Sequence, residues 1–292
     1  MSYLDRIAAC NTYDLAAFIP LVVDDVAVGW IHGSNVAALT GKGSPLIAKA
    51  ERISFAPGNE SPEERSAAIA KVAPAWVQLG LVPKLRREIY PVRRFWSDAD
   101  FFRIDRALAQ ILGCRAFGVH LNGYVKKNGG TWLWIGRRNS DRMIEPNKLD
   151  NMVAGGQPAD LGIEENLFKE CEEEAGMPAS LAQNAMPAGT VTYAFEGDRG
   201  LKVDTLFCYD LDVPEDFTPQ NRDGEILDFH LMPVEEVLAL IEAGPAFKFN
   251  VSLVILDFAI RHGLITPDKE PDYERILAGL HAPPPDSAGM PR

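Results

Sequence analysis

The sequence lacks the cysteine and histidine patterns that mark disulfide-rich or zinc-binding proteins. Its four cysteines form no C-x-x-C pair, and its five histidines show no spacing typical of metal ligands. The cysteines are Cys10, Cys114, Cys171 and Cys208. Scattered cysteines of this kind are typical of reduced thiols, so we expect a cytoplasmic protein.

The chain is also short of positive charge and of long apolar runs. It has 29 Lys and Arg against 41 Asp and Glu, and the net charge of -12 argues against nucleic acid or an anionic membrane as main partner. The longest apolar run, from Val251 to Ile260, is too short to span a bilayer and contains Asp257. The start, Met1 to Arg6, has no basic region followed by an apolar core, so no signal peptide is indicated. A small molecule is the expected partner, and the sequence leaves a homodimer open.

The length of 292 residues allows two domains with substantial cores. A change of pattern near Cys114 predicts an α+β domain over residues 1–114 and a second, larger domain over 115–281. Residues 282–292 include Pro283-Pro284-Pro285, which favours a disordered tail. The first domain could close over the organic part of a substrate and set specificity.

Hydrophobic periodicity and turn residues predict the secondary structure of both parts. In the first part we expect two strands within Phe18–Ile31 around Asp24-Asp25, and helices over Ser34–Thr40, Pro62–Leu79 and Asp98–Leu112. In the second part we expect an alternating strand from Phe117, a hairpin of Tyr124–Lys127 and Thr131–Ile135 around Asn128-Gly129, and strands at Thr190–Phe195, Val203–Leu211 and Ile226–Met232. Two helices follow, Val234–Ala243 and Val251–His262, the second capped by Asn250 and ended by Gly263.

The most informative segment is an acidic helix that follows Gly155-Gly156. Glu170, Glu173 and Glu174 lie three and four residues apart, so they share one helical face and repel one another. Gly176 ends the helix, so these carboxylates also face the negative end of its dipole. A divalent cation would make this arrangement tolerable, and a merely solvated acidic face is the alternative.

The ends of this helix can be predicted. Gly162 is an acceptable N-cap with Glu165 at the third helical position. Gly176 can adopt the left-handed conformation that ends a helix, and Pro178 follows. The apolar residues recur every fourth position and should form the buried stripe, namely Ile163, Leu167, Cys171 and Ala175.

This segment resembles the Nudix box, GX5EX7REUXEEXGU with U aliphatic, of the Nudix hydrolases. In this register Lys169 takes the place of the box Arg, Glu170 follows it, and Glu173-Glu174 is the Glu pair. The early Glu of the box falls on Leu161 or Gly162, so neither register gives a carboxylate at this position. The resemblance implies a Nudix α/β/α sandwich with a mixed sheet, and hydrolysis of a diphosphate.

The resemblance also implies the roles of individual residues. Mg²⁺ or Mn²⁺ would be held by Glu170, Glu173 and Glu174 and by a carbonyl of Ala154 or Gly155. Lys169 would orient Glu170, although Lys lacks the bidentate fork of Arg. A further Glu usually comes from a distant loop as metal ligand or general base, and Glu225 is the best candidate, with Asp223 second.

A narrower resemblance is to the thiamine-diphosphate-related Nudix group, which also carries an N-terminal extension. It is carried by stretches such as Lys148–Gly156, Lys169–Gly176, Asp223-Gly224-Glu225, Leu231–Val237 and Arg261–Pro267. It implies hydrolysis of thiamine diphosphate or its oxidised analogues to the monophosphate and phosphate. The alternatives are ADP-ribose, a dinucleotide or coenzyme A as substrate, a Nudix isomerase, and a non-catalytic ligand-binding module.

Basic residues between the hairpin and the glycines are candidates for contacting substrate phosphate. These are Arg137, Arg138 and Lys148, and we add Asp223 as a substrate-binding candidate. Surface charges that serve solubility are the alternative for each of them.

Overall fold

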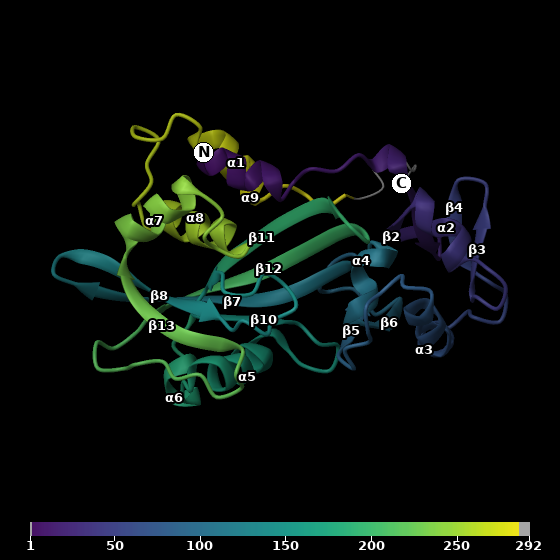
Figure 1. Cartoon of the computed structure of the whole chain (residues 1–292), viewed down its shortest axis with the longest axis horizontal. Coiled ribbons are helices and arrows are strands. Elements are labelled where there is room, and N and C mark those ends of the chain that lie inside the picture. Colours follow the sequence, from purple (N-terminus) through teal and green to yellow (C-terminus); the bar gives the residue numbers. More distant parts are fainter. Residues whose placement is uncertain (1, 286–292) are drawn as a thin grey trace.

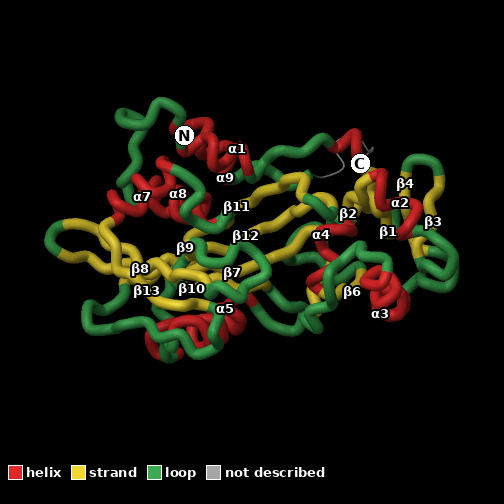
Figure 2. Tube along the Cα trace, viewed as in Figure 1, coloured by secondary structure: helices red, strands yellow, loops and turns green. Residues whose placement is uncertain are grey.

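The computed structural model describes residues 2–285 (Figure 1 and Figure 2). The first part of the chain carries a four-stranded sheet in the order β2-β1-β4-β3 and a two-stranded sheet of β5 and β6. The second part carries a larger sheet in the order β11-β12-β7-β8-β13. Two short strands join the larger sheet, β10 on β7 and β9 on β8.

The larger sheet is mixed. Its strands are β7 (Arg115–Lys127), β8 (Gly130–Arg138), β9 (Leu149–Asp150), β10 (Val153–Gly156), β11 (Met186–Gly197), β12 (Gly200–Asp212) and β13 (Ile226–Pro233). The pair β12 and β7 is parallel, whereas the other pairs are antiparallel. Gly155 and Gly156, which precede the acidic helix, belong to a strand, β10, because Val153 to Gly156 pair with Leu121 to Gly118 of β7.

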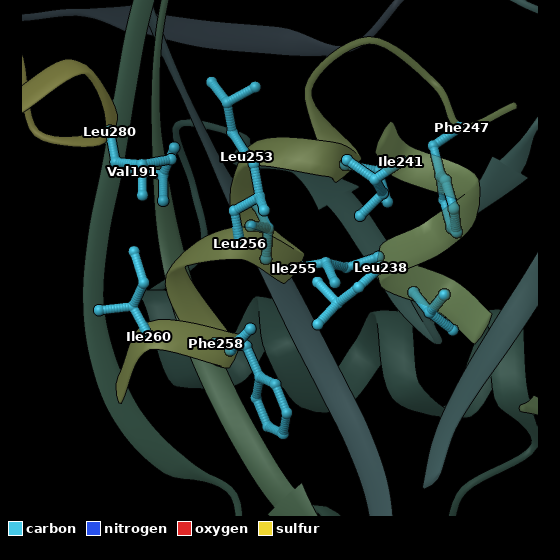
Figure 3. Packing of buried hydrophobic residues seen from close by; sticks show 14 of the residues in the cluster. Val191, Leu238, Ile241, Phe247, Leu253, Ile255, Leu256, Phe258, Ile260 and Leu280 are labelled. Carbon is cyan, nitrogen blue, oxygen red and sulfur yellow. The ribbon is translucent and has the colours of Figure 1, made fainter. Parts of the chain in front are cut away.

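Helices cover both faces of this sheet, as the sandwich predicted from sequence requires (Figure 1). On one face lie α7 (Val234–Ala243), α8 (Val251–Arg261) and α9 (Tyr273–Leu280), and on the other lie α5 (Ile163–Ala175) and α6 (Ala179–Ala182). Figure 3 shows the first core, where Leu253, Leu256 and Phe258 of α8 pack with Val191 of β11. The second core joins Val119 and Leu121 to α5. The fold is therefore an α/β/α sandwich.

The first helix of the chain packs into the core of the second part. This helix, α1 (Tyr3–Ala9), lies against α9, where a Cβ on Gly279 would come within 2.3 Å of Ile7 Cγ2. Its buried Ile7 belongs to the same apolar cluster as α7 and α8. Contacts of residues 1–114 with the second part therefore begin at the N-terminus itself.

The remaining elements of the first part surround their own apolar core. They are β1 (Phe18–Val23), β2 (Val26–His32), α2 (Gly33–Leu39), β3 (Leu46–Lys49), β4 (Arg52–Phe55), α3 (Pro62–Gln78), β5 (Ile89–Val92), β6 (Phe102–Asp105) and α4 (Ala109–Leu112). The predicted turn is present, since Asp24 and Asp25 both have positive φ. The predicted helix from Pro62 is also present, and its N-cap Ser61 forms a capping box with Glu64.

The predicted helix over Asp98–Leu112 is wrong for most of its length. Phe102–Asp105 forms β6 and pairs with β5, and a short 3-10 turn then leads into α4. Phe102 and Ile104 are buried while Arg103 and Asp105 are not, which is the alternation of a half-buried strand. Pairing with β5 therefore decides the conformation of this segment.

Other boundaries differ in smaller ways from the prediction. The alternating strand and the first arm of the hairpin are one strand, β7, and Asn128 and Gly129 both have positive φ, as a tight hairpin turn requires. Asn250 is the N-cap residue of α8, but its side chain makes no capping hydrogen bond and its amide N–H instead donates to the Tyr193 hydroxyl at 3.1 Å. The predicted elements omitted α1, β3, β4, β5, β9, α6 and α9.

The predicted tail falls mostly outside the described residues. Of residues 282–292, those from 286 onward are not described, whereas the carbonyl of Pro285 accepts a hydrogen bond from the Trp30 indole at 3.2 Å. Within residues 2–285, every helix is too short or too polar to cross a membrane.

Candidate metal and diphosphate site

The acidic helix forms as the sequence predicts. The Gly162 N–H donates to Glu165 Oε2 at 3.4 Å, and Gly176 has φ of 60° at the C-terminal end. The N–H groups of Gly176 and Met177 bond back to the carbonyls of Glu172 and Cys171, which satisfies the last turn. Leu167, Cys171 and Ala175 are buried, so the stripe that faces the sheet holds α5 against β10 and β7.

Strand β10 receives two carboxylates of α5. Glu174 is only 4% exposed, and its Oε2 accepts the Ala154 N–H at 2.7 Å. Glu170 lies against Gly155, where a Cβ would come within 2.3 Å of the Glu170 carboxyl carbon. Gly155 therefore leaves the space that Glu170 occupies, which the sequence-based metal-carbonyl role did not anticipate.

A loop from the other end of the domain completes the acidic cluster. The N–H groups of Gln220 and Arg222 donate to the carbonyls of Ala175 and Glu173, which fastens this loop to the end of α5. The carboxylate oxygens of Glu174, Asp223 and Glu225 consequently lie within 4.8 Å of one another.

The group of three neighbouring carboxylates in the structure differs from the predicted set of metal ligands. Of the predicted ligands, Glu174 belongs to this group of three oxygens, and Glu170 lines the same cleft. Glu173 also lines this cleft, and it accepts a hydrogen bond from Lys169 at 2.6 Å. Asp223, predicted as a substrate contact, stands with Glu174 and Glu225 among the possible ligands.

Lys169 lies between two carboxylates. Its Nζ is 3.3 Å from Glu170 Oε1 and 2.6 Å from Glu173 Oε2. Glu225 has a separate cationic partner, because Arg142 Nη2 lies 2.5 Å from its Oε2. These two cations offset part of the repulsion among the carboxylates.

Burial makes the remaining acidic groups hard to ionise without a cation. Burial raises the pKa of Glu170 to about 7 and, together with the Glu170 charge, raises the pKa of Glu174 well above its usual range. Burial likewise raises the pKa of Asp223, with the Glu225 charge adding to the effect. An all-oxygen donor set suits a hard divalent cation such as Mg²⁺ or Mn²⁺, whose charge would favour the ionised carboxylates.

The loop that lacks the early Glu is held by amides instead. The buried Gln157 side chain donates to the carbonyl of Leu161 at 2.8 Å, and Asn166 of α5 donates to the carbonyl of Gly156 at 2.9 Å. These two side chains tie the loop to both β10 and α5.

Of the basic residues predicted to contact phosphate, one lines the cleft and two lie outside its lining. Arg138 is buried and lines the cleft, but its Nη1 is paired with Asp150 Oδ2 at 2.6 Å. Arg137 forms a two-pronged pair with Asp228 outside the cleft lining. Lys148 donates to the carbonyl of Pro245 and also lies outside that lining.

Cations that the sequence did not single out line the cleft instead. We call Glu170, Glu173, Glu174, Asp223 and Glu225 the acidic set of the carboxylate cleft, and Arg86, Arg106 and Lys248 its basic set. No local pattern in the sequence marks Arg106 or Lys248. Lys248 is 15% exposed and lies 3.4 Å from Asp150.

A second cavity, the inner cavity, opens beside the carboxylate cleft and shares the basic set with it. Its lining from the sheet includes Phe117, His120, Tyr193 and Asp204, and its lining from the first part includes Tyr90 and Gln110. Asp204 accepts a hydrogen bond from the Tyr193 hydroxyl and lies 2.8 Å from Lys202. Both parts of the chain therefore enclose a partly aromatic, partly polar space next to the carboxylates.

Comparison with known proteins gives matches to both parts of the chain. Residues 2–116 match a domain of unknown function, DUF4743. The chain is 38% identical over 277 residues to "Nudix hydrolase 20, chloroplastic" of Arabidopsis thaliana, covering 91% of this chain and 74% of that protein. It is 39% identical over 275 residues to "Nudix hydrolase 24, chloroplastic" of the same plant, covering 93% and 75%.

Among solved structures, the DR0079 protein of Deinococcus radiodurans is similar to part of the chain. The identity is 22% and the TM-score is 0.45, over 58% of this chain and 97% of the other.

Proposed function

The chain belongs to the Nudix hydrolases, enzymes that act on pyrophosphate bonds, and from this premise we propose that it is a magnesium- or manganese-dependent diphosphohydrolase of a small organic diphosphate. The observation that carries the metal requirement is the meeting of Glu174, Asp223 and Glu225 from two distant segments. Three carboxylates brought this close without a full set of cationic partners favour a bound divalent cation.

Each residue of the cleft has a role in this proposal. Glu174, positioned by the Ala154 N–H, holds the metal together with Glu170 and Asp223. A divalent cation at this position would neutralise phosphate oxygens and acidify a water molecule. Glu225 completes the metal set or accepts the proton of the attacking water, and Lys169 orients Glu170.

Thiamine diphosphate or an oxidised analogue is the leading substrate in this proposal. The support is the likeness of Lys148–Gly156 and Asp223-Gly224-Glu225 to the thiamine-diphosphate-related group. The inner cavity adds support, because Phe117 and Tyr193 offer ring surfaces and Asp204 offers an acceptor to a heterocycle beside the diphosphate. The first part of the chain would contribute to specificity through Tyr90 and Gln110.

The test is hydrolysis of a panel of diphosphates with Mg²⁺ or Mn²⁺, followed by chromatography of the products, because an internal diphosphate gives two phosphomonoesters and only a terminal diphosphate releases inorganic phosphate. The panel holds thiamine diphosphate, its oxidised forms, ADP-ribose, a dinucleotide, coenzyme A and nucleoside diphosphates. The highest kcat/KM should fall on thiamine diphosphate or an oxidised form, and a clear preference for ADP-ribose would reject this substrate. No turnover of any compound would reject the enzymatic role.

A cytoplasmic location and a homodimer stay predictions from the sequence. Cell fractionation and light scattering would test them separately.

A further inference from the structure

Arg106 is a cation of the carboxylate cleft whose guanidinium is only partly engaged by neighbouring residues. It follows β6 in the first part of the chain, and its side chain is 45% exposed while lining both the carboxylate cleft and the inner cavity. Its Nη1 donates to Glu88 at 2.9 Å, and its guanidinium lies 5.6 Å from the centre of the Tyr90 ring. Among the described residues, neither Nε nor Nη2 donates a hydrogen bond to the protein.

The backbone of β10 relates Arg106 to the acidic set. A Cβ on Gly156 would lie 3.3 Å from Arg106 Nη1 and 1.7 Å from the Tyr90 hydroxyl, while a Cβ on Gly155 would meet Glu170. Successive residues of a strand point to opposite faces. Glu170 and Arg106 therefore approach adjacent glycines from the two faces of β10, and both line one cleft.

The charges on the two sides suit a diphosphate. Lys248 stands with Arg106 in the lining, and both carry charge of the sign that phosphate oxygens require. A phosphate chain bound in this cleft would meet the carboxylates of the acidic set on one side and the N–H groups of Arg106 on the other.

We propose that Arg106, a residue outside the Nudix box, binds a phosphate of the substrate and so makes the first part of the chain a component of the diphosphate site. Glu88 and Tyr90 hold the guanidinium against Gly156 and leave Nε and Nη2 for phosphate oxygens. This inference rests on the proposed function, because it assumes a diphosphate in the carboxylate cleft.

The experiment measures binding without turnover. Calorimetry in the presence of Mg²⁺ measures the affinity for methylene diphosphonate, a non-hydrolysable diphosphate without an organic group. The proteins compared are wild type, Arg106→Ala and Arg106→Lys. We expect Arg106→Ala to weaken binding about 10- to 100-fold, since a charge-assisted hydrogen bond is lost. Arg106→Lys, which keeps the charge but loses the planar fork, should fall between the two.

Arg137→Ala is the matched control. Arg137 also pairs with one carboxylate and is 41% exposed at its side chain, close to the 45% of Arg106, but it lies outside the cleft. The affinity of the Arg137→Ala variant for the diphosphonate should stay within about twofold of that of wild type. If Arg106→Ala fails to fold, as judged by circular dichroism, Arg106→Lys decides the question.

Kinetics on the substrate panel separate this inference from the proposed function. Loss of Arg106 should raise KM by a similar factor for every diphosphate, because phosphate is the shared group. Wild-type turnover with an unchanged KM in Arg106→Ala would overturn this inference alone, as would a loss confined to one organic group. Absence of wild-type turnover would overturn the function, and failure of wild type to bind the diphosphonate would overturn the inference.

Discussion

The acidic and basic sets of the carboxylate cleft have different origins. Three of the five acidic residues lie within one helical turn, and the other two lie in one tight loop, so local sequence already brings most of them together. The basic set comes from positions 86, 106 and 248, which only the tertiary structure assembles. The carboxylates that we propose as metal ligands come from two short segments of the sequence, whereas the cations that we propose to face the substrate come from separate elements.

The acidic set should dominate catalysis. Glu174→Gln keeps an acceptor for the Ala154 N–H but removes a metal ligand, and we expect kcat/KM to fall about 10³-fold, or about 4 kcal/mol. Steady-state phosphate release with Mg²⁺ measures the loss. Equal rates in variant and wild type would remove the role assigned to Glu174.

The same variant should not lose stability in the absence of metal. Glutamine replaces a buried carboxyl whose ionised form is disfavoured by burial, so the midpoint of thermal unfolding should stay level or rise. A large fall in the midpoint would mean that Glu174 is mainly structural.

A buried histidine on β7, the strand beside β10, offers a test that involves neither set. His120 pairs across the strands with Ala154, and burial lowers the pKa of its imidazole to about 4. Between the usual pKa of about 6.5 and pH 4 the unfolded state binds the proton and the folded state does not, so the free energy of unfolding falls as pH falls. At pH 4 the loss should reach about 3 kcal/mol.

Replacement by a residue that does not titrate should flatten this acid dependence. Denaturant unfolding of wild type and His120→Gln between pH 7 and pH 4 provides the comparison. An acid slope identical in both proteins would show that His120 is not the source.

A side chain at position 155 should lower activity because it would displace Glu170. Gly155→Ala puts a Cβ within 2.3 Å of the Glu170 carboxyl carbon, so Glu170 must move, and we expect kcat/KM to drop about 10²-fold. Gly162→Ala is the control on the same helix, because its Cβ would meet nothing within 4 Å. Similar kinetics for the two variants would show that Glu170 tolerates displacement.

Lys169 should have the smallest effect of these residues. Lys169→Ala removes the contacts with Glu170 and Glu173, and a roughly tenfold loss of kcat/KM is expected for a residue that orients a metal ligand. Lys169→Arg should retain activity, since arginine can hold both carboxylates. If the alanine variant is as active as wild type, Lys169 is only a surface charge.

Much of the fold on the acidic side could be predicted from sequence. Gly162, the apolar stripe and Gly176 mark α5 with signals that act within a few residues, and the structure reproduces its bounds. Asn128-Gly129 likewise predicts its hairpin through a local need for positive φ. Such features are predictable because the interactions that stabilise them lie close in sequence.

The segment from Asp98 to Leu112 shows where this reasoning fails. Its apolar residues fit a helix as well as a short strand, and only pairing with β5 selects β6. Arg106 then emerges at the end of that strand, so the error in secondary structure also concealed a residue of the cleft. Asn250 was similarly predicted to cap α8, but its side chain donates a hydrogen bond to the distant Tyr193 hydroxyl.

By itself the sequence determined the acidic helix and its caps and predicted a cation, because repulsion and capping operate between neighbours along the chain. Only the tertiary structure decided which carboxylates meet, that Gly155 makes room for Glu170, and that cations of the first part face them. Those outcomes depend on strand pairing and loop attachment between segments far apart in sequence, which no local pattern encodes.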